Sequence, residues 1–259
     1  MKINIYNQPV PWATYRAELI GTGILVAVGL SIVILSFGQG SPIIQLIPNA
    51  GLRRLITGFL FGCTGGLIAI SPIGKESGAH INPAVTFGFW LMSKIRVHHA
   101  MGYVFAQILG AMLGSLPLVA WGVMGRSIDF GATLPGTSYG IGWALIGEML
   151  TTFILIFGLF FFLQHRYLKS FTPAIFPFLY AIMVFAEANV SGTSTNPARS
   201  FGPALISGNW HAWWVYWLGP FMGVLMAVGT YQITGRHLSD ITVAKLHHFE
   251  HDRYGIFHL

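Results

Sequence analysis

Long uncharged stretches dominate the hydrophobic pattern of this chain. A helix needs about 20 apolar residues to cross the hydrocarbon of a bilayer. Stretches of that kind cover residues 19–40, 55–74, 97–125, 141–164, 170–186 and 200–235, and only Glu148 interrupts the fourth. Because they are continuously apolar rather than alternating, they predict helices and not a transmembrane barrel. The last stretch is too long for one span, so we expect six full helices with chain left over after the second and before the sixth.

Composition supports a membrane location. Hydrophobic residues make up 54% of the 259 residues, and Asp, Glu, Lys and Arg make up only 8%. A soluble domain carries about 25% charged residues, and so few charges could not cover a soluble surface of this size. The composition therefore excludes a cytosolic enzyme and a secreted globular protein, and predicts a single-domain integral membrane protein.

The net charge of +6 does not indicate binding to nucleic acid, because the basic residues form no cluster. The single cysteine, Cys63, excludes an internal disulfide and a cysteine-based zinc site. His247 and His251 have helical spacing, but no cysteine joins them, so we expect a solvated, pH-sensitive tail rather than a metal site.

Basic residues in the short loops predict the topology, since cytoplasmic loops are enriched in Lys and Arg. Most of them fall on one side of the predicted spans: Lys2, Arg16, Lys75, Lys94, Arg96, Arg166, Lys169, Arg236, Lys245 and Arg253. Both termini are therefore predicted to be cytoplasmic. We expect an N-terminal tail over residues 1–13, a channel-like domain over 14–235 and a C-terminal tail over 236–259. Short tails and the lack of targeting signals favour a bacterial inner membrane.

The chain carries one pattern twice. Glu18 opens the first span and Glu148 opens the fourth, while Asn82-Pro83-Ala84 and Asn196-Pro197-Ala198 occupy the second and fifth loops. Each half thus contains three helices, so the second half enters the membrane from the opposite side. This is an inverted repeat about an axis in the membrane plane.

Each Asn-Pro-Ala motif predicts the start of a short helix, because Asn is a favoured N-cap and Pro is favoured at the first helical position. Residues 82–93 and 196–207 would each form about 18 Å of helix at about 1.5 Å per residue. Two such half-helices end to end span about 30 Å of hydrocarbon. Their N-termini would converge near the middle, where irregular backbone is tolerated only when buried or lining a water-filled cavity. The sequence therefore predicts a pore.

These motifs resemble the aquaporin, or major intrinsic protein, family. The resemblance covers roughly residues 14–235 and includes Ser77-Gly78-Ala79-His80, Thr86 and Arg199-Ser200 around the two motifs. It implies an all-α membrane protein with six transmembrane helices and two re-entrant half-helices. It further implies a homotetramer in the bilayer, a pore in each protomer, and passive passage of water or small uncharged solutes. No cofactor, metal or catalytic residue is implied.

The resemblance also implies roles for single residues. Asn82 and Asn196 would present amides to a water oxygen at the pore centre, which with the positive helix ends would exclude protons and ions. Arg199 would belong to the outer constriction, since an ionisable group at membrane depth is functional by default. Glu18, Glu148 and His80 are expected to brace the re-entrant loops, because irregular backbone in a membrane needs such partners. For His80, a role as a gate is the alternative.

The predicted selectivity filter departs from both branches of the family. Counting from the motifs places Gly62, Val184, Thr193 and Arg199 in the filter; water channels usually place Phe and His at the first two positions, and glycerol channels use two aromatics. Ser200, Ala204 and Tyr216-Trp217 nevertheless resemble the water branch. A wider filter makes glycerol, urea, ammonia or hydrogen peroxide alternatives to water alone. Phe59 or Phe61 could refill the gap if the helix rotates.

Glu187 lies one turn beyond Val184 and has two interpretations. It could bond to loop backbone near the headgroups, or it could orient Arg199 and draw solutes into an outer vestibule. Two other function classes are weaker. A coupled secondary transporter needs a titratable or ion-binding group at the midplane, where the motifs offer Asn, Pro and Ala. A membrane enzyme would depend on Glu18, Glu148 and His80, and the helix-opening positions of the glutamates argue against a shared site.

Overall fold

A computed structural model describes residues 10–234, 244–247 and 252–257, and this part of the chain contains helices and no strand. The long helices are the six that the apolar stretches predict. They are α1 (Trp12–Phe37), α3 (Ala50–Ile70), α6 (Val97–Ser115), α8 (Ile141–Gln164), α9 (Thr172–Glu187) and α11 (Val215–Ile233). Five spans are long and apolar enough to cross a membrane: α1, α3, α8, α6 with the short helices that follow it (Val97–Arg126), and α9 with the 3-10 turn before it (Lys169–Glu187). The sixth, α11, has 19 residues and an internal Pro220.

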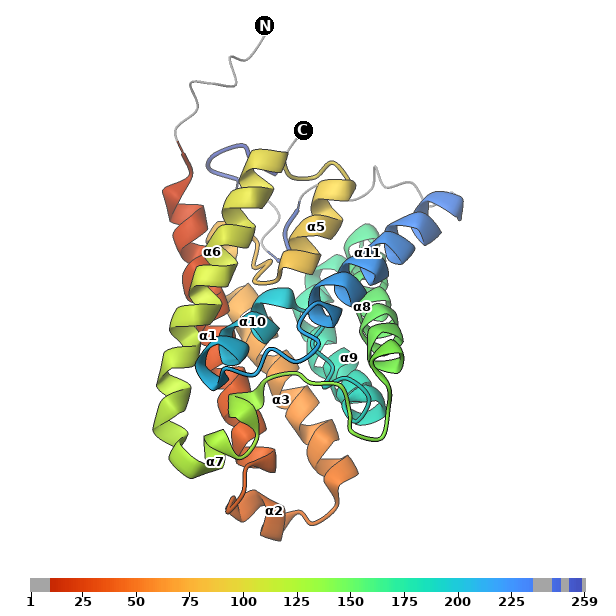
Figure 1. The fold of residues 1–259 in the computed structure, drawn as a ribbon. Helices are drawn as coiled ribbons and strands as arrows, with labels where there is room; N and C mark the ends of the chain where they lie inside the picture. The colour runs from red at the N-terminus through yellow and green to blue at the C-terminus, as the bar shows by residue number, and fades with distance from the viewer. Residues whose placement is uncertain (1–9, 235–243, 248–251, 258–259) are drawn as a thin grey trace, which may run out of the picture.

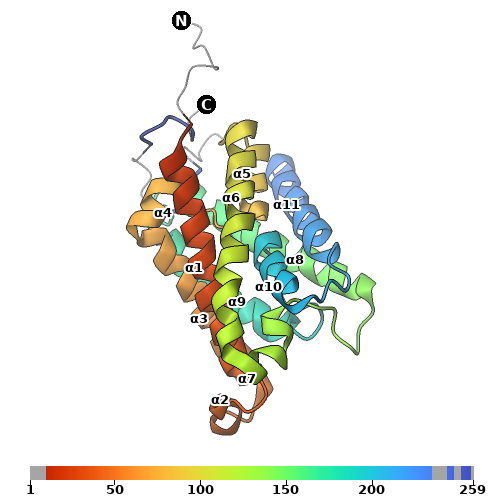
Figure 2. The ribbon, with the colours of Figure 1, turned by 60° about the vertical axis from the view of Figure 1, so that its left-hand side comes forward.

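Helix pairing follows the inverted repeat. Helix α1 packs along α6 in the first half, and α8 packs along α11 in the second half (Figures 1 and 2). The middle helices of the two halves, α3 and α9, pack against each other. This arrangement fits a two-fold relation between the halves. Such a relation exchanges the α1–α6 pair with the α8–α11 pair, and it exchanges α3 with α9.

Glycines allow these helices to approach closely. A side chain at Gly114 of α6 would collide with the Gly23 carbonyl of α1, and one at Gly62 of α3 would collide with the Phe176 carbonyl of α9. Small residues let backbones meet in a bilayer, where no hydrophobic force drives helices together.

The bundle is apolar outside, and its interior combines a hydrophobic core with buried polar groups. Large hydrophobic side chains such as Met101, Phe105 and Leu67 are more than 60% exposed, whereas Glu18 and Glu148 are 0% exposed. A soluble protein has the opposite distribution. The outer surface is therefore suited to lipid, and the interior contains the groups available for function.

Two short helices fill the centre. Helices α5 (Pro83–Leu91) and α10 (Pro197–Ser207) begin at the Asn-Pro-Ala motifs and are capped by the Asn82 and Asn196 side chains. In Figure 1, α5 lies toward the end of the bundle at which α1 begins and α11 ends, called here the terminal face. Helix α10 lies toward the opposite face. Helix α5 is shorter than the predicted 82–93, because the chain turns after Leu91 with a positive φ of 55° at Ser93.

The remaining short elements lie at the two faces. On the opposite face are α2 (Pro42–Leu46), a 3-10 helix (Leu116–Trp121), α7 (Gly122–Arg126) and a second 3-10 helix (Asp129–Gly131). Helix α4 (Pro72–Ser77) precedes the first re-entrant loop, and a further 3-10 helix (Lys169–Phe171) precedes α9.

The expectation of a solvated C-terminal tail is wrong for much of its described part. Lys245, Leu246, Ile256 and Phe257 are each at most 4% exposed. They pack against the re-entrant loop of the first half, which supplies apolar surface and free carbonyl groups. His251 of the histidine pattern lies outside the described residues.

Candidate functional site

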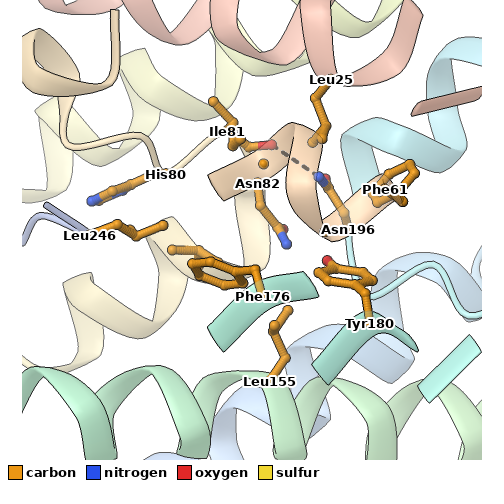
Figure 3. A pocket seen from close by; sticks show the side chains of 13 residues that line it. Leu25, Phe61, His80, Ile81, Asn82, Leu155, Phe176, Tyr180, Asn196 and Leu246 are labelled. Atoms are coloured by element: carbon orange, nitrogen blue, oxygen red, sulfur yellow. Dashed lines mark hydrogen bonds between the residues drawn. The ribbon is translucent and has the colours of Figure 1, made fainter. Parts of the chain in front are cut away.

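A narrow internal cavity lies where the two half-helices meet (Figure 3). Its volume is about 40 Å³, enough for a few water molecules, since a single one needs about 10–15 Å³. Most of its wall is apolar, and the two motif asparagines supply polar groups. The lining residues include Leu25, Phe61, Gly62, His80, Ile81, Asn82, Val85, Leu155, Phe176, Tyr180, Asn196 and Leu246.

The two asparagines tie the re-entrant loops together across the cavity. Asn82 Nδ2 donates to the Thr195 carbonyl (2.9 Å), and Asn196 Nδ2 donates to the Ile81 carbonyl (3.0 Å). Each amide oxygen meanwhile accepts from the backbone of its own helix, at Ala84 N or Ala198 N. An amide nitrogen carries two hydrogens, so each asparagine retains one donor that can face the cavity. The two N-terminal helix ends add positive partial charge at the same place.

The backbone of the two loops has matching conformations. Residues three and one before each motif asparagine, Ala79 and Ile81 in one loop and Thr193 and Thr195 in the other, all have φ between 42° and 55°. Left-handed conformations cost non-glycine residues about 1–3 kcal/mol each, so the surroundings must hold them in place.

In the first loop, Glu18 supplies that support. Its carboxylate accepts from His80 N (3.0 Å), Ile81 N (2.7 Å) and Gln107 Nε2 (2.7 Å). The Gln107 amide also donates to Thr86 Oγ1 (3.0 Å) at the first turn of α5. Helices α1 and α6 therefore act together on this loop.

In the second loop, Glu148 takes the equivalent position. Its carboxylate accepts from Ser194 N (2.7 Å), Thr195 N (2.8 Å) and Ser191 Oγ (2.6 Å). Ser194 Oγ is also 2.5 Å from Ser200 Oγ on α10. Each buried glutamate thus receives two consecutive backbone N–H groups and one side-chain donor.

His80 lines the cavity on the side of the terminal face. Its Nε2 donates to the Ala244 carbonyl (2.7 Å), which fixes that nitrogen as the one bearing hydrogen, and its Nδ1 lies 3.1 Å from Thr86 Oγ1. The ring stacks on Phe89 at 4.8 Å between centroids. His80 thus joins the first loop, α5 and the C-terminal segment.

On the side of the opposite face, Arg199 lies beside two aromatic rings. Its Nη1 donates to the Gly131 carbonyl (2.7 Å), and its guanidinium carbon is 5.9 Å from the Phe61 ring centre. Phe61 in turn lies 5.4 Å from Tyr180. Phe61 lines the cavity together with Gly62, whereas Phe59 packs against Phe178 (5.6 Å) and is 37% exposed.

The other predicted filter residues, Thr193 and Val184, contact Glu187 and α3. Thr193 Oγ1 donates to Glu187 Oε2 (2.5 Å), so Glu187 bonds to the second loop and not to Arg199 within the described residues. Glu187 Oε1 is buried without a hydrogen-bond partner in the described structure. Val184 is half-buried and packs near Gly58 of α3.

Sequence reasoning missed Tyr180, Phe176 and Leu246 as cavity-lining residues. Tyr180 is one helical turn before Val184 on α9, so the helical spacing was a usable signal. Leu246 had no such signal, because its position depends on docking of the C-terminal segment.

Comparison with known proteins agrees with this geometry. The family model described as major intrinsic protein matches residues 6–231. The chain belongs to the major intrinsic protein family. Aquaporin PIP2-7 of Arabidopsis thaliana is 34% identical over 85% of this chain and 81% of its own length. Aquaporin AqpM of Methanothermobacter marburgensis is 34% identical over 83% of this chain and 94% of its own length. Aquaporin-4 of Mus musculus is 34% identical over 85% of this chain and 67% of its own length.

A solved structure supports the fold. The aquaglyceroporin from Plasmodium falciparum aligns over 86% of this chain and 96% of its own, with a TM-score of 0.67 at 20% sequence identity. Six transmembrane helices with two re-entrant half-helices in an inverted repeat are therefore confirmed. As a member of this family, the protein is an integral membrane channel and not an enzyme.

Proposed function

We propose that this channel conducts water passively and excludes protons and ions. The observation that carries the proposal is the pair of asparagine amides, each tied to the other loop and each with one remaining N–H for the cavity. A water oxygen that accepts from both would point its own hydrogens away along the pore. The chain of water molecules then cannot relay a proton through the centre, and the positive helix ends repel cations.

Within this proposal, Glu18, Glu148 and His80 are positioning residues that fix the loops. Arg199, Phe61 and Tyr180 form the outer constriction together with Thr193 and Gly62, while Val184 and Glu187 support it from α9. Arg199 has one Nη1 contact to a carbonyl. Its other N–H groups are suited to donate to a permeating oxygen, and its charge repels cations.

Passage of other small neutral solutes is a second candidate. The cavity wall is mostly apolar, with Leu25, Val85, Leu155 and Phe176 among the lining residues. Such a wall does not penalise the carbon atoms of glycerol or the low polarity of ammonia. The rings of Phe61 and Tyr180 narrow the constriction, which favours water as the main solute.

The topology and assembly are part of the same proposal. The excess of Lys and Arg at the terminal face supports a cytoplasmic location for that face. A homotetramer is expected, with a pore in each protomer. Native mass spectrometry of the purified protein measures this oligomeric state. A mass equal to one chain would contradict this part.

Stopped-flow light scattering on reconstituted vesicles tests the function. We expect osmotic shrinkage faster than that of empty vesicles, with a weak temperature dependence and no ion coupling. Glycerol and urea gradients in the same vesicles measure the second candidate. Absence of excess water flux, both in the wild type and in the substitutions described below, would contradict the proposal.

A further inference from the structure

The C-terminal segment reaches the pore. Residues 244–247 and 252–257, called here the tail segment, lie at the terminal face against α4, α6 and the first re-entrant loop. Leu246 lines the same cavity as Asn82 and Asn196 and is 4% exposed. Figure 3 shows its side chain beside His80, on the side of the cavity away from Phe61.

Three hydrogen bonds anchor the tail segment around Leu246. Leu246 N donates to the Gly78 carbonyl (3.0 Å), and His80 Nε2 donates to the Ala244 carbonyl (2.7 Å). Lys245 Nζ donates to the Lys75 carbonyl at the end of α4 (3.1 Å). The tail thus satisfies polar groups of the re-entrant loop that would otherwise face the channel opening.

A second set of contacts holds the far part of the segment. The Asp252 carboxylate accepts from Ile256 N (3.1 Å) and Phe257 N (3.3 Å), which closes a compact turn. The Phe257 ring lies 4.8 Å from Lys245 Nζ and 6.4 Å from the His80 ring. Phe257 is 2% exposed and does not line the cavity, so it secures the segment without narrowing the pore.

The re-entrant loop has a surface that fits the tail. Gly78 adopts φ +85°, and a side chain there would lie 2.8 Å from the Ala244 carbonyl and 3.1 Å from Lys245 Cα. Contacts this close require a residue without Cβ. Loop and tail are therefore packed backbone to backbone, directly before the first Asn-Pro-Ala motif.

We propose that the tail segment is an autoinhibitory plug, in which Leu246 closes the terminal mouth of the pore and conduction requires release of the segment. The proposal rests on the channel function proposed above. The channel with the docked tail segment is then a low-conductance state, in equilibrium with an open state in which the segment is undocked. The permeability per channel then reports the undocked fraction.

Two substitutions in the full-length chain test the plug. Leu246→Ala removes the side chain in the pore, and Phe257→Ala loosens the anchor outside it. Both are expected to raise water permeability per channel, Leu246→Ala by about tenfold, because truncating a packed Leu shifts the equilibrium that buries it by at least that factor. Leu46→Ala, on the opposite face where Leu46 is 76% exposed, is the matched control and leaves permeability unchanged.

Thiol labelling measures docking without flux. The Leu246→Cys substitution in a Cys63→Ala chain is expected to react slowly with a polar maleimide, and adding Phe257→Ala speeds the reaction. Fast labelling at position 246 while Phe257 is intact overturns the plug, as does equal water flux in wild type, Leu246→Ala and Phe257→Ala. If Phe257→Ala speeds labelling but no variant conducts water, the proposed channel function fails, and the plug with it.

Discussion

The loops that precede α5 and α10 are held by equivalent glutamate hydrogen bonds, but the residues that follow the two motifs differ in chemical character. Glu18 and Glu148 each accept two consecutive backbone N–H groups and one side-chain donor. Beyond the motifs, α5 continues with Val85 and Thr86, whereas α10 continues with Arg199 and Ser200. The duplicated part of the site therefore builds the re-entrant backbone.

The parts that differ form the two mouths. On the α10 side, the Arg199 guanidinium lies 5.9 Å from the Phe61 ring, which lies 5.4 Å from the Tyr180 ring, and we propose that these three side chains form the outer constriction. On the α5 side, the tail segment and His80 close the cavity with an apolar side chain. An inverted repeat supplies a symmetric centre, and residues outside the repeated pattern give each mouth its own function.

Removing either glutamate should produce the largest effect. Glu148→Ala leaves two buried N–H groups and a hydroxyl without their acceptor, and is expected to destabilise the fold by about 3 kcal/mol or more. Glu18→Ala should cost a similar amount because it strands an equal number of donors. Thermal unfolding in detergent measures both. If only one of the two substitutions lowered the unfolding temperature, the two loops would not depend equally on their glutamates.

Arg199→Ala should change selectivity more than stability. Its side chain makes one hydrogen bond in the described structure, to the Gly131 carbonyl, and in the proposed function its charge faces the outer constriction. We expect glycerol and cation leakage to rise about tenfold, equivalent to about 1.4 kcal/mol of barrier, while water flux stays high. Vesicle swelling assays and an ion-sensitive dye measure the change. Unaltered selectivity would remove Arg199 from the filter.

Phe61→Ala should widen the constriction. Because the ring lies between Arg199 and Tyr180, its loss is expected to raise urea and glycerol permeability severalfold. Phe59→Ala is the matched control on the same helix, since that ring packs against Phe178 away from the cavity. Equal effects of the two substitutions would show that the filter lies elsewhere.

A smaller effect concerns pH at the plug. Burial lowers the pKa of Lys245 to about 8, although the carboxylates of Asp252 and Glu76 oppose the shift. An undocked lysine has a pKa of about 10.4. At a pH between the docked and undocked pKa values, docking of the segment therefore releases a proton from Lys245. Raising the pH above about 8 therefore strengthens docking, and water permeability should fall toward pH 10.

The other groups around Lys245 are the neutral His80 ring, which bonds to Ala244, and the Phe257 ring. Lys245→Met is expected to abolish the decline in permeability above pH 8. A decline that persists in this variant would assign the pH dependence to another group.

The sequence predicts the centre of this molecule better than its mouths. Asn82 and Asn196 could be placed at helix starts because capping and proline preferences act locally. Glu18 and Glu148 stood out as carboxylates in apolar spans. In contrast, the presence of Phe61 beside Gly62 in the cavity wall depends on the rotation of α3 against α9, which the close approach of Gly62 to the Phe176 carbonyl fixes.

The tail shows the limit of composition. Its charges and histidines are typical of a solvated segment, yet Lys245 and Leu246 are buried because Gly78 and His80 offer them a fitted surface. Such docking depends on the exact shape of a partner loop that lies 164 to 170 residues earlier in the chain, and no local pattern encodes it.

The central claim is that the two loops form a pore for water but not for protons. Simultaneous recording of light scattering and of an enclosed pH dye, in vesicles containing the Leu246→Ala channel, tests it most directly. The account predicts fast osmotic water flux together with proton flux equal to that of empty vesicles. Proton flux rising in step with water flux, or no water flux above empty vesicles, would contradict it.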